Sequence, residues 1–67
     1  MTEIKDIRQN MVATGDPETG TVELRHGGRG MRVVLSEGQT VTLTRGDTVT
    51  EVTRKQGGFF IQREYAG

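Results

Sequence analysis

The sequence predicts an all-β fold: a small antiparallel meander of five to six short strands, curled into a barrel-like sheet. Ten threonines and seven valines against two alanines are typical of pleated strands. Ten glycines suit many short turns. Apolar and polar residues alternate over several short runs, which is the period of a half-buried strand. We expect residues 1–67 to form one domain, because a chain of this length encloses only one small core.

Two interpretations compete for the first twenty residues. Ile4, Ile7, Met11 and Val12 lie at the spacing of one helix face, which predicts a short N-terminal helix. The alternative places residues 8–14 in a strand, because Thr-Gly-Asp-Pro-Glu-Thr-Gly at 14–20 is strong turn chemistry. That strand would form a hairpin with residues 21–25, leaving residues 1–6 frayed or as an edge strand. We favour the hairpin.

Residues 21–25 and 31–35 alternate in polarity and are predicted to be strands, joined by the glycine-rich segment 27–30. Residues 40–44 give the cleanest alternation, with three threonines on the outer side. The inward residues of these three strands are expected to be Val22, Leu24, Met31, Val33, Leu35, Val41 and Leu43.

The last two strands are predicted at residues 48–54 and 59–65. Val49 and Val52 are three residues apart, so we expect a bulge near Thr50 and Glu51 that turns both valines inward. The adjacent Phe59 and Phe60 must point to opposite faces of a strand.

We expect Phe59 to point inward with Ile61 and Phe60 to point outward beside Gln62. Tyr65 has the parity of Phe59 and is expected at the rim of the core.

Composition excludes several classes of protein. Without cysteine there is no disulfide framework and no thiolate site, and a lone histidine, His26, cannot supply two imidazole ligands to a metal within one chain. No apolar run approaches the length of a membrane span, and the N-terminus lacks the regions of a signal peptide. We therefore expect a soluble, cytoplasmic protein that binds no cofactor.

Charge is unevenly distributed along a chain of zero formal charge. Residues 1–24 carry five acids and two bases, and residues 25–67 carry four acids and seven bases. The balance is minus three and then plus three. This asymmetry suggests an anionic partner for the C-terminal part, or neutralisation of one half by the other within the fold or across a subunit contact.

The segment 25–32, Arg-His-Gly-Gly-Arg-Gly-Met-Arg, is the most distinctive in the chain. It is interpreted either as a glycine-filled turn with solvated arginines or as a cationic loop whose backbone N–H groups cradle an anion. In the second case an outward Phe60 would stack on an unpaired base. The candidate contacts to an anion or a nucleic acid are Arg25, His26, Arg29, Arg32, Arg54, Lys55 and Arg63.

Catalysis is not expected. The nine acids fall mostly in turns or at outward positions, and Ser36 lies in an ordinary turn rather than in a nucleophile elbow. We predict a non-enzymatic β binding module that self-associates through Phe60, Val34, Gln62 and a strand edge, as an adaptor, regulator or assembly component.

Two alternatives to that module stay open. The first is binding of RNA or single-stranded DNA. The second is a small oligomeric enzyme with a site built across subunits around His26. No membrane and no small-molecule substrate is implied.

Overall fold

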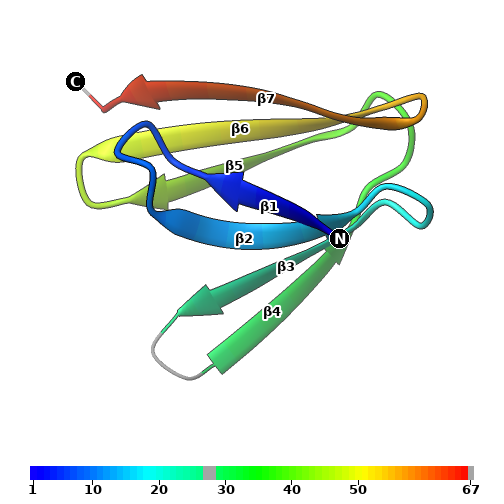
Figure 1. Cartoon of the computed structure of the whole chain (residues 1–67), viewed down its shortest axis with the longest axis horizontal. Coiled ribbons are helices and arrows are strands. Elements are labelled where there is room, and N and C mark those ends of the chain that lie inside the picture. Colours follow the sequence, from blue (N-terminus) through cyan, green and yellow to red (C-terminus); the bar gives the residue numbers. More distant parts are fainter. Residues whose placement is uncertain (27–28, 67) are drawn as a thin grey trace.

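Seven antiparallel strands form two sheets in the computed structural model, which describes residues 1–26 and 29–66 (Figure 1). For residues 25, 26 and 29 it describes the backbone alone. The strands are β1 (Thr2–Lys5), β2 (Met11–Asp16), β3 (Thr21–His26), β4 (Arg29–Val34), β5 (Thr40–Arg45), β6 (Thr48–Lys55) and β7 (Gly58–Tyr65). One sheet has the order β1-β2-β3-β4 and the other β5-β6-β7.

The predicted all-β class is confirmed, but the strand number and the barrel are not. The described residues form seven strands rather than five to six, and they do not form a closed barrel. The meander is interrupted between β4 and β5 because the chain crosses from one sheet to the other there. The buried Leu35 fixes this crossing: its N–H donates to the carbonyl of Gly20 at 2.8 Å, and the Arg54 guanidinium donates to its carbonyl at 2.8 Å.

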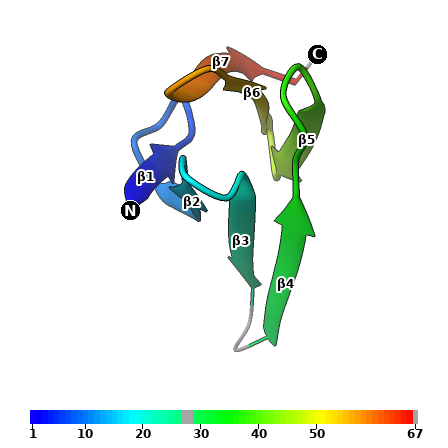
Figure 2. The same ribbon diagram turned by 90° about the vertical axis from the view of Figure 1, so that its right-hand side faces the viewer.

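The two sheets surround a common interior, which Figure 2 shows nearly end-on. β7 lies beside β1, where the Nε of Arg63 donates to the carbonyl of Lys5 at 2.6 Å. On the other side the β3–β4 hairpin extends away from β5, β6 and β7 (Figure 2). On that side the Arg45 side chain of β5 donates to the carbonyl of Met11 in β2 at 3.4 Å, so contact between the two sheets is sparser there than between β7 and β1.

The core between the sheets is small. Its fully buried apolar residues are Ile4, Ala13, Val22, Leu35, Leu43 and Val52. The ring of Phe59 adds to it by lying against Gly15 on the facing sheet. A Cβ at Gly15 would come within 2.7 Å of the Cε2 atom of that ring. A side chain at position 15 would therefore displace the ring of Phe59.

The N-terminal hairpin is confirmed, and the alternative helix is wrong. β1 is the edge strand of its sheet, and β2 pairs with β3 across the predicted turn. Asp6 ends β1 and prevents a helix: its buried carboxylate accepts the N–H groups of Arg8 and Asn10, each at 2.9 Å. These bonds favour a tight loop over helical continuation. The register shifts between Ile4 and Lys5, where the loop begins.

The predicted bulge in β6 is wrong. β6 pairs with both β5 and β7 without a register shift, so Thr48, Thr50 and Val52 all point into the core and Val49 lies outside, half-buried. A bulge in this central strand would disrupt two ladders at once. Two threonines in the core are the result of regular pairing on both sides.

Burial of the β4 residues is also less complete than predicted. The register aligns Met31 with Leu24 and Ala13, on the core side of the sheet, yet Met31 is 65% exposed. Three strands face four in this sandwich, so the last strand of the larger sheet has little opposite it.

Candidate interaction surface

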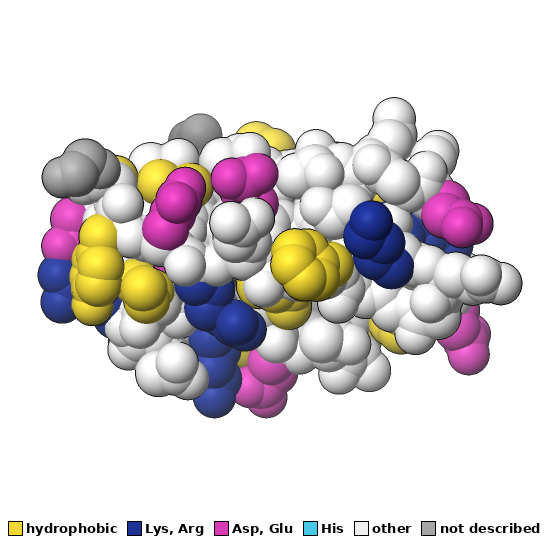
Figure 3. All heavy atoms as spheres, turned by 90° about the horizontal axis from the view of Figure 1, so that it is seen from above, with side chains coloured by type: hydrophobic (Ala, Val, Ile, Leu, Met, Phe, Trp, Pro, Cys, Tyr) yellow, Lys and Arg dark blue, Asp and Glu magenta, His cyan; other side chains and the backbone are white. Residues whose placement is uncertain are grey.

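Many large apolar side chains of the described residues are exposed. Six of them are more than half exposed, whereas the buried core has five large apolar side chains and Ala13. The exposed six are Met1, Met11, Met31, Val34, Phe60 and Tyr65. Seen from above β7 in Figure 3, hydrophobic side chains form separate groups between polar and charged ones. No single patch gathers them on that face.

Two of the three residues predicted for self-association share one face, and the third lies in the other sheet. Phe60 is 56% exposed on the outer face of β7, and Gln62 is exposed on the same face, as expected from the alternation of the strand. Val34 is 64% exposed but belongs to β4, in the other sheet. Phe60 and Val34 therefore cannot be neighbours within one strand ladder.

The basic residues proposed around Phe60 mostly make contacts within the chain. The Arg54 guanidinium donates to the carbonyls of Leu35 and Glu18, and Arg63 donates to Lys5. The register pairs Arg54 with Phe59, so both side chains lie on the face opposite to Phe60.

The remaining basic candidates are dispersed. Arg32 forms an ion pair with Glu23 at 3.2 Å across β3 and β4. Lys55 is exposed at the end of β6, opposite Gly58. The side chains of Arg25, His26 and Arg29, predicted to line the cationic loop, lie outside the described residues, as does the turn at 27–28.

One cluster escaped prediction because its members are far apart in the sequence. Arg8, in the loop after β1, binds Asp47 in the turn between β5 and β6 through two hydrogen bonds, with Nε at 3.1 Å from Oδ1. Its guanidinium lies 5.3 Å from the centroid of the Tyr65 ring. The hydrogen bond from Arg8 lowers the pKa of Asp47 below its usual value, and the same bond raises the pKa of Arg8.

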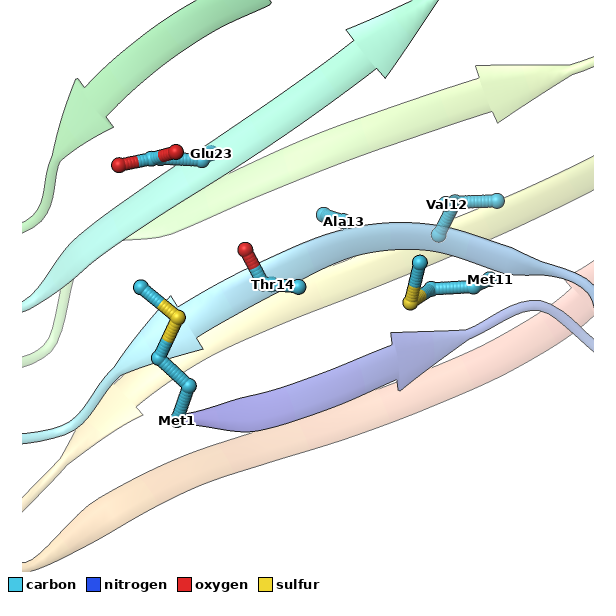
Figure 4. Close-up of a pocket in the computed structure, with 6 residues that line it drawn as sticks. All are labelled: Met1, Met11, Val12, Ala13, Thr14 and Glu23. Carbon is cyan, nitrogen blue, oxygen red and sulfur yellow. The ribbon is translucent and has the colours of Figure 1, made fainter.

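A shallow apolar hollow of about 210 Å³ is lined by residues of β2 and β3 and by Met1, which precedes β1. Its lining residues are Met1, Met11, Val12, Ala13, Thr14 and Glu23. Figure 4 shows Met1 and Met11 near the two ends of β1, on either side of Thr14. Glu23, which pairs with Arg32, supplies the charge, so the hollow suits apolar contact better than proton transfer.

A second groove, of about 310 Å³, runs along the free edge of β5. Thr42, Leu43 and Thr44 all line it. Since successive side chains of a strand point to opposite faces, three consecutive residues share a groove only where it follows the edge of the strand. Val12 and Leu24 form its opposite wall, from the other sheet.

Among the side chains that the structure describes, no three His, Cys, Asp or Glu residues lie close enough together to hold a metal ion. No helix in residues 1–26 or 29–66 has the length and apolarity needed to cross a membrane.

Comparison with known proteins finds no matching family model, no curated protein and no solved structure of significant similarity.

Proposed function

We propose that this protein is a non-enzymatic binding module that associates with a second copy of itself, as an adaptor, regulator or assembly component. The observation that carries the proposal is the groove between the free edge of β5 and strands β2 and β3 of the other sheet. There, Val12, Leu24 and Leu43 line a groove that opens to solvent. A core of so few side chains gains stability when a partner covers apolar surface, by about 25 cal/mol for each Å² removed from water.

The hydrogen bonds and ion pairs of three carboxylates support a binding function rather than catalysis. Asp6 accepts backbone N–H groups, Asp47 pairs with Arg8, and Glu23 pairs with Arg32. General acid–base chemistry needs carboxylates that converge on one cleft with different pKa values. These three have structural partners and lie in different parts of the fold.

The contacts of the arginines favour a protein partner over a nucleic acid. Arg54 and Arg63 donate to backbone carbonyls on the face of β6 and β7 that is opposite to Phe60. An aromatic stacking site needs its cations on the same surface, where they track the phosphate backbone.

Molar mass in solution tests the proposal. We expect light scattering or sedimentation equilibrium to give the mass of two chains at micromolar to millimolar concentration, at both low and high salt, because apolar association is not screened. Adding a mixed pool of RNA and single-stranded DNA should leave that mass unchanged. The mass of one chain at every concentration would contradict the proposal. Binding of the pool that weakens steeply with salt would favour the nucleic-acid alternative instead.

A further inference from the structure

The four edge strands of the two sheets differ in how well they are protected. Natural sheets guard their edges with charged residues or with a covering segment. β1 carries Glu3 and Lys5, and its Lys5 carbonyl is bound by Arg63 from β7, so these two edges face each other. β4 carries Arg29 and Arg32. By contrast, β5 has no charge from residue 40 to residue 44. Its one charged residue, Arg45, lies at the end of the strand, where it lines the groove and donates to the carbonyl of Met11 at 3.4 Å.

The free edge of β5 also lies beside apolar side chains of the other sheet. Its groove is walled on the far side by Val12 and Leu24. Among the described residues, hydrogen bonds between backbone groups of β5 and a neighbouring strand are found on the β6 side. An added strand could therefore pair with β5 and place alternate side chains over Val12 and Leu24.

The sequence of β5 is complementary to itself in the antiparallel sense. It runs Thr40-Val41-Thr42-Leu43-Thr44. A two-fold axis at Thr42 would set Val41 opposite Leu43 of the partner subunit on the inner side. The same axis would set threonine opposite threonine at every outer position. Apolar and threonine pairs of this kind each stabilise a ladder, and no like charges meet.

From this edge we propose that two copies join through β5, antiparallel and centred on Thr42, to form one continuous six-stranded sheet. The inference rests on the proposed self-association and specifies its surface. In this arrangement the Val41 and Leu43 side chains that the partner contributes enter the groove over Val12 and Leu24. Because the axis relates one edge to itself, the contact is isologous and closes at two copies.

A charge swap at the axis tests the pairing. Thr42 is exposed on the outer face, so the variants Thr42→Arg and Thr42→Glu should each fold, with an unchanged far-UV circular dichroism spectrum. Like charges would then stand directly opposite each other, and we expect the dissociation constant of the dimer to rise about tenfold or more in each variant. An equimolar mixture of the two should recover the two-chain mass, because Arg would then face Glu.

Gln62→Arg and Phe60→Ser are the matched controls, since both sites lie on the outer face of β7 and outside the proposed contact. Neither should change the mass. If the wild type is a dimer that Thr42→Arg leaves intact, or if Gln62→Arg or Phe60→Ser dissociates it, the β5 contact is wrong while self-association stands. A dimer lost in both Thr42 variants and not recovered on mixing also overturns the two-fold pairing. A monomeric wild type removes the proposed function itself.

Discussion

Thr50 places a hydroxyl in the core without a hydrogen-bond partner among the described residues, although its side chain is only 1% exposed. A buried polar group without a partner costs free energy that an apolar group of the same shape would not. Thr48, two residues earlier and equally buried, differs because its hydroxyl donates to the carbonyl of Arg45 at 2.8 Å. The two threonines thus form a natural pair for comparison.

Replacing each threonine by valine should change stability in opposite directions. Thr50→Val removes the unpaired hydroxyl and should raise the free energy of unfolding by about 1 kcal/mol. Thr48→Val removes a satisfied hydroxyl, leaves the carbonyl of Arg45 without that donor, and should lower the free energy by about 1 to 3 kcal/mol. Urea unfolding of the two variants and the wild type measures both effects. A destabilised Thr50→Val would show that this hydroxyl has a partner, such as an ordered water.

Single residues also explain two of the turns. Gly20 follows the predicted turn and has a φ of 79°, which glycine adopts without strain. A side chain there would also meet the carbonyl of Leu35 at 2.2 Å, so no other residue fits without a shift of the backbone. In the loop after β1, Gln9 has a φ of 70° without being glycine, and Asp6 on the same loop supplies the compensating hydrogen bonds.

At the scale of elements, the ends of the two sheets are held together by the cluster of Arg8, Asp47 and Tyr65. Arg8 belongs to the loop between β1 and β2, whereas Asp47 is in the turn between β5 and β6. The carbonyl of Asp47 also accepts the N–H of Ala66, just beyond β7. Asp47 therefore connects its own turn to the loop after β1 and to the end of β7.

This cluster should make stability depend on acid pH. The Arg8 hydrogen bond lowers the pKa of Asp47 in the folded chain. The ionised Asp47 therefore stabilises the fold fully at pH values above its pKa in the unfolded chain. This stabilisation is lost as the pH falls through its pKa in the folded chain. Thermal unfolding of the wild type and Asp47→Asn should therefore differ near neutral pH, with the variant less stable. The difference should shrink as the pH falls below the ordinary pKa of an aspartate and vanish once Asp47 is protonated in the folded chain as well. Both groups are exposed, so we expect a small effect, and a difference independent of pH would contradict it.

At the scale of the whole molecule, a three-stranded sheet packs on a four-stranded sheet and does not cover all of it. The fourth strand of the larger sheet, β4, leaves Met31 exposed on the side that faces the interior, and β5 borders an open groove. A chain of 67 residues buries little apolar surface, so its folded state is only marginally stable. Association with a second copy would remove this exposed apolar surface from water.

Thermal stability should consequently rise with protein concentration. For a folded dimer and an unfolded monomer, a hundredfold increase in concentration adds about 2.7 kcal/mol per dimer, or about 1.4 kcal/mol per chain. In a domain of this size that corresponds to an increase in Tm of about 5 to 10 °C. Differential scanning calorimetry over that range measures the shift. A Tm independent of concentration would indicate a monomer that is stable alone. Thr42→Arg, with its weaker dimer, should have a lower Tm than the wild type at the same concentration.

Local patterns were enough to predict much of the architecture. Alternating residues identified the strands after Gly20, although residues 29 and 30 belong to β4 rather than to the predicted turn and β6 has no bulge. The Asp-Pro-Glu-Thr-Gly turn identified the N-terminal hairpin, and the parity of Phe59 and Phe60 gave their two directions. These features depend on neighbours in the chain, so a short stretch of sequence contains their cause.

Features that depend on partners distant in the chain could not be predicted in the same way. Thr50 faces the core because β6 has a ladder on each side, and Arg8 meets Asp47 because two loops 39 residues apart converge at one end of the sandwich. The side of β5 that stays unpaired is likewise set by Leu35, whose bonds turn the chain into the second sheet. Strand periodicity gives the direction of a side chain relative to its neighbours in the chain. Packing between the two sheets determines which residues, if any, that side chain contacts.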